Sequence, residues 1–261
     1  MPEMTSYEPG TPSWVDLGTP DVDGAASFYG SLFGWSVPEA ENAEETGGYR
    51  LAMQDGRPVA GVMPLMAEGQ PPAWSTYVSV EDADATAAAV RESGGTVVVE
   101  PTDVLQLGRM AFFADPGGAV LGVWQAKEFP GAGLTNEPVS VVWNELNTRD
   151  PEGARDFYGA ALGWSSEDTE PVEGMTYTEW HRGDGALVAG MLDIRGRLPD
   201  EVPAHWLVYF AVADCDATVG RAKELGGTVA MEPMDLPVGR FAVLVDPFGA
   251  HFAVISMAEA G

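Results

Sequence analysis

The sequence contains two copies of one pattern, and this internal repeat restricts the possible folds more than any other feature. Trp-Val-Asp-Leu-Gly-Thr-Pro-Asp, from Trp14 to Asp21, is answered by Trp-Asn-Glu-Leu-Asn-Thr-Arg-Asp, from Trp143 to Asp150. The short motifs Phe-Tyr-Gly, Gly-Trp, Gly-Gly-Thr-Val, Gly-Arg and Asp-Pro then recur in the same order in both halves. We therefore predict two domains, residues 8–127 and 137–258, joined by a segment near residues 128–138 with the Gly and Pro content of a linker.

Each copy has the pattern of a strand, a helix and three strands, followed by the same series again. Asp21 and Asp150 stand where a helix N-cap is expected, and Pro151 suits the first helical position because its missing N–H is harmless there. We predict helices over residues 21–33 and 82–93 and a hairpin turn at Asp55-Gly56. The chain is therefore expected to be an α+β protein with four βαβββ units.

These motifs resemble the vicinal-oxygen-chelate superfamily, which includes glyoxalase I, bleomycin-resistance proteins and extradiol dioxygenases. The resemblance rests on a first strand followed by Asp-x-x-x-Ala-x-x-Phe-Tyr, on the strands before Asp82 and Asp214, and on the Asp-Pro-x-Gly segments at Asp115 and Asp246. It covers nearly the whole chain and looks most like duplicated bacterial glyoxalase-like proteins, some loosely called hydroxylases. It implies a tandem repeat of two glyoxalase-like domains, whose four βαβββ units form cupped mixed sheets with the ligand inside.

The resemblance leaves two ways of forming the cups. If the two units of one copy form a cup, Glu145 shares its cup with His251 and Asp16 does not. If the copies exchange units, Asp16 meets His251 and Glu145 meets Ser75. The sequence does not choose between them.

Metal-dependent members of the superfamily place ligands on the first strand, on the strand after the midpoint and, as a Glu, on the last strand. The corresponding residues here are Trp14, Ser75 and Gly122 in the first copy, and Trp143, Leu207 and Ala253 in the second. These side chains bind a divalent ion poorly or not at all, so we predict no metal and no other cofactor. The alternative is a non-standard metal site near His205, which shares a strand face with Leu207, or near His251.

Residues two apart on a strand share a face, so the neighbours of the ligand positions should also point into the cups. The predicted inner residues are Trp14, Asp16, Ser75, Tyr77, Val120 and Trp124 in the first copy, and Trp143, Glu145, Asn147, Leu207, Tyr209, His251 and Ile255 in the second. This set is rich in aromatic rings and holds a few polar groups, which is typical of a small-molecule pocket. We therefore predict ligand-binding residues at Trp14, Ser75, Tyr77, Trp124, Trp143, Asn147, Leu207, Tyr209 and His205.

Three inner residues carry groups suited to acid–base catalysis. Burial beside tryptophan would raise the pKa of Asp16 or Glu145, and a carboxylate with a raised pKa can act as a general base. His251 would serve as a proton shuttle beside either acid. Each has a purely structural alternative: the acids lie on the outer surface if the strand register shifts by one, and a single core histidine is more often structural. For Trp14 and Trp143 the structural alternative is that they only fill their cups.

Charge and composition exclude several classes of partner. The chain of 261 residues has 40 acidic and 13 basic residues and a net charge of −27, which repels nucleic acids and anionic membranes and favours a cationic ligand. Its single cysteine, Cys215, permits no intramolecular disulfide, and the N-terminal residues do not resemble a signal peptide. No apolar run approaches the ~20 residues of a membrane span. We predict a cytoplasmic monomer or homodimer.

Three functions compete at this level. The first is a metal-free cup protein that binds a small apolar or aromatic molecule, in natural-product resistance or tailoring, as the resemblance to bleomycin-resistance proteins implies. The second is an enzyme: a glyoxalase-like lyase or hydroxylase with a non-standard metal site, or a metal-free catalyst built on Asp16, Glu145 and His251. The third is a structural duplicate whose cups are filled by tryptophan and whose function lies on the outer surface.

Overall fold

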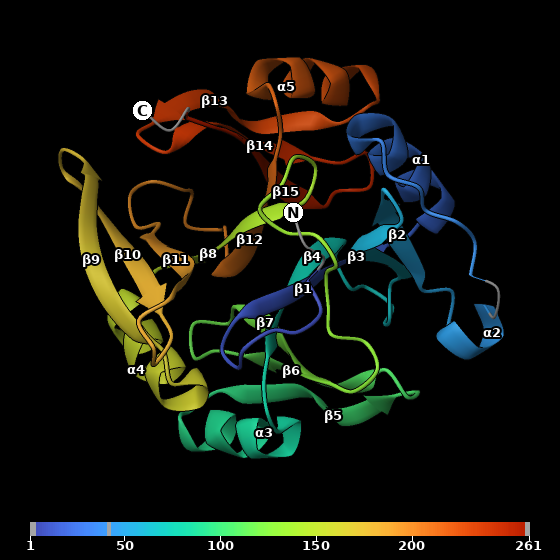
Figure 1. Cartoon of the computed structure of the whole chain (residues 1–261). Helices are drawn as coiled ribbons and strands as arrows, with labels where there is room; N and C mark the ends of the chain where they lie inside the picture. Colours follow the sequence, from blue (N-terminus) through green and yellow to red (C-terminus); the bar gives the residue numbers. More distant parts are fainter. Residues whose placement is uncertain (1–3, 41–42, 259–261) are drawn as a thin grey trace.

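The computed structural model describes residues 4–40 and 43–258 (Figure 1). The first copy contains β1 (Pro12–Thr19), α1 (Val22–Phe33), α2 (Ala43–Thr46), β2 (Arg50–Gln54), β3 (Arg57–Pro64), β4 (Ala73–Ser79), α3 (Ala83–Glu92), β5 (Thr96–Val104), β6 (Gly108–Ala114) and β7 (Val120–Ala126). The second contains β8 (Val141–Thr148), α4 (Pro151–Leu162), β9 (Ser165–Val172), β10 (Met175–His181), β11 (Leu187–Asp193), β12 (His205–Ala211), α5 (Cys215–Glu224), β13 (Thr228–Leu236), β14 (Gly239–Val245) and β15 (His251–Met257). Among the described residues, no helix has both the length and the apolar character needed to cross a membrane.

Each copy builds one curled, mixed sheet from its own strands. The first sheet has the order β2-β3-β1-β4-β7-β6-β5, and the second has the order β13-β14-β15-β12-β8-β11-β10-β9. In both, the first strands of the two units pair antiparallel at the centre, β1 with β4 and β8 with β12. The predicted α+β tandem of cupped sheets is confirmed, and the cups form within each copy without exchange of units.

The helices begin where the sequence indicates. Asp21 accepts a hydrogen bond from the N–H of Gly24 at 2.9 Å, and Asp150 accepts one from the N–H of Gly153 at 3.0 Å. Each side chain satisfies an N–H that has no partner within the first turn of its helix. Because β1 and β8 lead directly into these capped helices, the caps fix where each central strand ends.

The first βαβββ unit differs from the predicted pattern. Between α1 and β2 the expected strand is reduced to an isolated bridge between Ser36 and Met53, whereas the second copy has the full strand β9 at the equivalent place. Residues 41–42 of this connection lie outside the described chain. The first sheet therefore has seven strands and the second has eight.

The two sheets pack back to back, so that their inner faces point away from each other. One large core joins Leu17 and Phe28 of the first copy to Phe210 and Phe252 of the second, and another joins residues such as Leu121 and Trp206. At the centre, Thr76 Oγ1 on β4 donates to Asn144 Oδ1 on β8 at 2.7 Å. Figure 1 shows α1 near α5 and α3 beside α4 at the two ends of this double layer.

Two equivalent chains of hydrogen bonds join the two copies. Tyr29 of α1 donates to Asp246 Oδ2 of the second copy at 3.0 Å, and Trp74 Nε1 donates to the Tyr29 oxygen at 2.9 Å. The reciprocal chain runs from Trp206 through Tyr158 to Asp115 Oδ2, with distances of 2.9 and 3.0 Å. The repeated Phe-Tyr and Asp-Pro motifs thus meet across the interface, each copy supplying a tyrosine to the aspartate of the other.

Candidate functional site

The aromatic side chains predicted to point inward gather on the inner face of each sheet. In the first copy, Trp14, Tyr77 and Trp124 pack with Phe112 and with Ala132 of the linker. In the second copy, Leu207, Tyr209 and Ile255 pack with Phe241 and Ala253, and a partly buried Trp143 lies against them. The strand register that placed these residues on one face is therefore correct, and the alternative register that shifts by one residue is wrong.

A buried carboxylate lies at the base of the first inner face. Asp16 is 3% exposed and its Oδ2 accepts hydrogen bonds from the hydroxyl of Tyr77 at 2.8 Å and from that of Tyr49 at 3.4 Å. Trp14 Nε1 donates to the Tyr49 oxygen at 2.7 Å. Ser75, opposite Asp16 in the strand pairing, also hydrogen-bonds this carboxylate. No Lys or Arg side chain forms an ion pair with it among the described residues.

The second inner face repeats this arrangement with a glutamate. Glu145 is 7% exposed and its Oε1 accepts from the hydroxyl of Tyr209 at 3.0 Å and from Asn147 Nδ2 at 3.3 Å. Tyr177 also hydrogen-bonds the Glu145 carboxylate and accepts from Trp143 Nε1 at 2.7 Å. Both copies therefore place one carboxylate, two tyrosines and one tryptophan in the same relation to the central strands.

Two glycines make room for these networks. A Cβ at Gly61 of β3 would overlap the hydroxyl of Tyr49, and a Cβ at Gly190 of β11 would overlap that of Tyr177. Both glycines lie beside the carboxylates, because Gly61 pairs with Asp16 and Gly190 pairs with Glu145. Neither glycine is needed for a left-handed backbone, since no positive φ occurs at either residue. Their role is to let a phenol lie directly on the strand.

Burial raises the pKa of both carboxyl groups. For Asp16 the loss of solvation raises the pKa from 3.8 to about 6, although the hydrogen bonds from Tyr77, Tyr49 and Ser75 act in the opposite direction. Burial likewise raises the pKa of Glu145 against the hydrogen bonds that it accepts. Ionising a buried acid without a cationic partner costs free energy, so each of these carboxyl groups keeps its proton to a higher pH than it would in water.

This shift predicts a pH-dependent stability. Between about pH 4 and pH 6 Asp16 keeps its proton in the folded protein but loses it in the unfolded chain. Protonation of Asp16 therefore adds to the free energy of unfolding at low pH, and this contribution disappears as the pH rises through 6. At 1.36 kcal/mol per pKa unit the full contribution is about 3 kcal/mol, of which about 2.4 kcal/mol is lost between pH 4 and pH 7. The Asp16→Asn variant has no ionisable group at this position. When urea unfolding is followed from pH 4 to 7.5, its free energy of unfolding should lack this pH-dependent contribution. Identical pH profiles for the two proteins would contradict the assignment.

The remaining predicted residues lie at the edge of the cups. His205 begins β12 with its Nδ1 2.9 Å from the carbonyl oxygen of Pro203. Burial lowers the pKa of His205, the hydrogen bond to Pro203 acts in the opposite direction, and the nearby His251 lowers the pKa further. His251 begins β15 and is exposed, and no hydrogen bond or ion pair joins it to Glu145 or Asp16 among the described residues. Val120, predicted to point inward, is 45% exposed because it lies at the first residue of β7.

The residues present do not fit the metal site that the superfamily implies. Three adjacent central strands bring Trp14, Tyr77 and Gly122 together, but the Tyr77 ring lies on Gly122, where an added Cβ would be 2.6 Å from its Cδ1. A longer ligating side chain at this position would displace the ring. Within residues 4–40 and 43–258, no group of three or more His, Cys, Asp or Glu side chains is placed to hold a metal ion.

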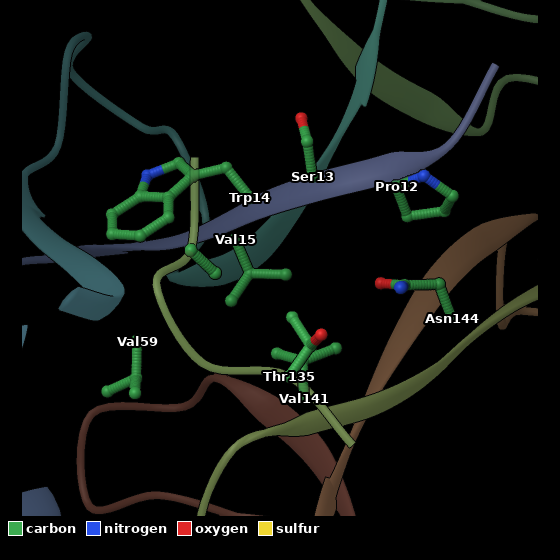
Figure 2. Close-up of a pocket in the computed structure, with 9 residues that line it drawn as sticks. Pro12, Ser13, Trp14, Val15, Val59, Thr135, Val141 and Asn144 are labelled. Atoms are coloured by element: carbon green, nitrogen blue, oxygen red, sulfur yellow. The ribbon is translucent and has the colours of Figure 1, made fainter. Parts of the chain in front are cut away.

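Two hollows in the structure lie outside the inner faces. Figure 2 shows the first, where Val15 points toward Val141 and Thr135 while the Trp14 ring points away from them. Its volume is about 10 Å³, which is too small for an organic ligand. The second, of about 270 Å³, lies between the β2–β3 turn and the linker, where it is lined by Gln54, Asp55, Arg57, Leu134, Glu137, Pro138 and Val139.

Sequence reasoning missed the second tyrosine of each network and the glycine beneath it. The repeat itself contains the signal, because Val59-Ala60-Gly61 matches Val188-Ala189-Gly190 at the same offset as Trp14 and Trp143. Tyr49 and Tyr177 are harder to match, since the connection that precedes them differs in length between the copies. The linker residue Phe129 was also missed, although its ring packs on Trp14.

Both halves of the chain match family models of the glyoxalase type. A family model described as the Glyoxalase/Bleomycin resistance protein/Dioxygenase superfamily matches residues 11–123, and one described as Glyoxalase-like domain matches residues 141–255. The chain is 44% identical over 98% of its length to the Anthracycline biosynthesis protein DnrV of Streptomyces peucetius, covering 96% of that protein. It is equally 44% identical to the Putative glyoxylase CFP32 of Mycobacterium tuberculosis, with 99% of each chain covered.

Solved structures share the fold at much lower identity. The Mn(II)-bound glyoxalase from Novosphingobium aromaticivorans superposes with a TM-score of 0.62 at 16% identity, covering 95% of this chain and 82% of its own. The 2,2',3-trihydroxybiphenyl 1,2-dioxygenase from Sphingomonas wittichii gives a TM-score of 0.64 at 15% identity, covering 95% of this chain and 91% of that enzyme. At such identity the likeness concerns the arrangement of strands and helices alone.

Proposed function

Because this chain belongs to the glyoxalase/bleomycin resistance protein/dioxygenase superfamily, we propose that it binds a small apolar or aromatic molecule on an inner face without a resident metal. The observation that carries this proposal is the repeated carboxylate–tyrosine–tryptophan network. It occupies the place where metal-dependent relatives are expected to hold their ion, and it is bordered by apolar and aromatic side chains.

The chemistry of these faces suits a flat ligand. Indole and phenol rings offer rigid surfaces for stacking, and their N–H and O–H groups are held by hydrogen bonds within the network. The net charge of −27 favours neutral or cationic molecules over anions. The 44% identical relative from Streptomyces peucetius is called an anthracycline biosynthesis protein, and anthracyclines are flat polycyclic aromatic compounds. We propose that natural products of this kind are the ligand class, in resistance or in a tailoring step.

The proposal predicts saturable binding of a planar hydroxylated aromatic. Titration with 1,4-dihydroxyanthraquinone should quench the tryptophan fluorescence along a binding curve, because Trp14 and Trp143 belong to the two networks. Anthraquinone-2-sulfonate, a flat anion, should bind more weakly, because the negative surface repels it. N-acetyltryptophanamide is the control for absorption by the dye. Quenching of the protein no stronger than that of the control would refute the proposal.

A metal-free catalyst is the second candidate, and the raised pKa of Glu145 favours it. A carboxyl group with a pKa closer to neutrality can accept and return a proton on a bound molecule. Its hydrogen bonds to Tyr209 and Asn147 would hold it in position for that exchange. Conversion of the bound compound by the wild type, lost in Glu145→Gln while binding remains, would identify this role.

A further inference from the structure

In the second copy, an arginine fills the groove between the β10–β11 turn and the segment that precedes β1. Arg182 Nε donates to Asp184 Oδ1 at 3.1 Å, its Nη1 donates to Thr11 Oγ1, and its side chain is only 16% exposed. The hydrogen bond to Asp184 raises the pKa of Arg182 against the effect of burial, and the charge of Glu8 adds to this rise. A Cβ at Gly10 would lie 3.2 Å from the Arg182 Cγ, so the arginine stem lies on this glycine. Two carboxylates and a glycine thus surround one guanidinium.

The corresponding groove of the first copy holds a shorter side chain. Gln54 is the counterpart of Arg182, since each follows a residue that pairs with the serine after a Gly-Trp motif, Ser36 or Ser165. The hollow of about 270 Å³ lies here, between the β2–β3 turn and the linker. The Gln54 amide is poorly satisfied: its Oε1 is buried without a partner among the described residues, and its Nε2 donates to Asp55 Oδ2 at 3.5 Å. The hollow therefore corresponds to the place that the Arg182 guanidinium fills in the second copy.

The hollow keeps the two carboxylates of the filled groove. Asp55 stands in the β2–β3 turn as Asp184 stands in the β10–β11 turn, each directly before a glycine. Glu137 precedes a proline as Glu8 does, at the same offset that relates the first strands of the two copies. A guanidinium binds carboxylates through charge-assisted hydrogen bonds. The first groove therefore offers the acids that hold Arg182 in the second, but no guanidinium of the chain stands at the counterpart position.

Two further differences define what the first groove can accept. Val139 stands in place of Gly10 with the same left-handed backbone, and with Leu134 and Pro138 it gives the hollow an apolar side. Arg57 also lines the hollow, and it forms no ion pair among the described residues. An apolar wall suits an aliphatic stem, and an unpaired arginine suits a carboxylate.

We propose that this hollow is a binding site for a small guanidino acid, in which a short aliphatic stem joins a guanidinium to a carboxylate. The guanidinium lies by Asp55 and Glu137, as the side chain of Arg182 lies by their counterparts, and the carboxylate pairs with Arg57. The stem lies on Val139. The site is separate from the two inner faces, so it adds a second ligand to the one proposed there.

The first test compares three probes by isothermal titration calorimetry of the full chain. We expect 4-guanidinobutyrate to bind saturably with one equivalent per chain. Propylguanidine lacks the carboxylate and butyrate lacks the guanidinium, so each should bind at least about tenfold more weakly, the effect of one lost charged hydrogen bond. Equal binding of all three probes would contradict the recognition of both charged groups.

The second test changes the walls of the hollow. Gln54→Arg gives the first groove the side chain of the second, and it should abolish binding of 4-guanidinobutyrate by occupying the site. Glu137→Gln should weaken this binding about tenfold. Arg57→Ala should weaken it by a similar factor while leaving propylguanidine unaffected. Glu8→Gln is the matched control in the filled groove, and it should change the affinity by less than about twofold.

The outcomes separate this site from the inner faces. No binding of 4-guanidinobutyrate by wild type, or equal binding by wild type and Gln54→Arg, would overturn the proposal. Weakening by Glu8→Gln without an effect of Glu137→Gln would place the probe in the second groove and would also overturn it. Gln54→Arg should still bind 1,4-dihydroxyanthraquinone as wild type does, so failure of this site leaves the proposed function untouched. Circular dichroism confirms that each variant is folded.

Discussion

Replacing Gly61 and Gly190 by alanine should destabilise the protein by about 3 kcal/mol each, the upper end of the cost of overpacking a core. The new methyl groups would overlap the hydroxyls of Tyr49 and Tyr177, which are already fixed by hydrogen bonds from Trp14 and Trp143. Displacing either phenol also deprives a buried carboxylate of a donor. In urea unfolding the double variant should lose about 6 kcal/mol, since the two sites belong to separate cores.

Two controls distinguish this collision from a general intolerance of alanine. Gly183→Ala adds a methyl group where no atom lies within 4 Å, and it should change the stability by less than about 0.5 kcal/mol. In a Tyr49→Ala background the phenol is gone and the Asp16 Cβ, 2.9 Å from the added methyl group, is the close contact that remains, so Gly61→Ala should cost less than it does alone. An equal cost in both backgrounds would show that the phenol is not the group that Gly61 accommodates.

Removing the hydroxyls of Tyr29 and Tyr158 together should cost about 5 kcal/mol of unfolding free energy, at 1.5–3 kcal/mol for each hydrogen bond to a buried charged group. Each tyrosine to phenylalanine change leaves an aspartate oxygen and an indole N–H without a partner at the interface between the copies. The contributions should add, because one chain lies in each of the two large cores.

The matched control for the tyrosine pair is Tyr7→Phe. Tyr7 donates a hydrogen bond to the Ala132 carbonyl and also bonds the Thr135 side chain, and no carboxylate among the described residues accepts from it. Its loss should cost about 1 kcal/mol, as is usual for a neutral hydrogen bond. If the double variant of Tyr29 and Tyr158 were no less stable than Tyr7→Phe, the two reciprocal chains would not be what joins the copies.

Much of this fold could be predicted from the repeat and the capping residues. Asp21 and Asp150 marked the helix starts because their carboxylates suit an N-cap, and period-two alternation identified Asp16 and Glu145 as inward-facing. Strand exchange could not be decided, because both arrangements bury the same apolar faces. The reciprocal contacts of Tyr29 and Tyr158 depend on how two finished sheets pack, which no local pattern encodes.

The candidate site was predicted only in outline. Period-two alternation along the central strands identified Trp14, Tyr77 and Tyr209. It gives no information about Tyr49 and Tyr177, whose side chains reach the site from a neighbouring hairpin. Phe129 was missed because residues 128–138 were interpreted only as a linker by composition, whereas the Phe129 ring is partly buried against the aromatic cluster of the first inner face. The repeat alone did not indicate this contact, because the linker lies outside the repeated motifs.

The most direct test of the account is the metal dependence of binding. Protein stripped with EDTA and dialysed against chelator-treated buffer is titrated with 1,4-dihydroxyanthraquinone by calorimetry, and the titration is repeated after adding Mn(II), Ni(II), Zn(II) or Fe(II). Each titration is corrected by a protein-free titration of the dye with the same ion, because 1,4-dihydroxyanthraquinone itself chelates these ions. Since tyrosines and a single carboxylate occupy each inner face, the account then predicts the same affinity and stoichiometry in every case. Binding or conversion of the compound that appears only after one of these ions is added would contradict it.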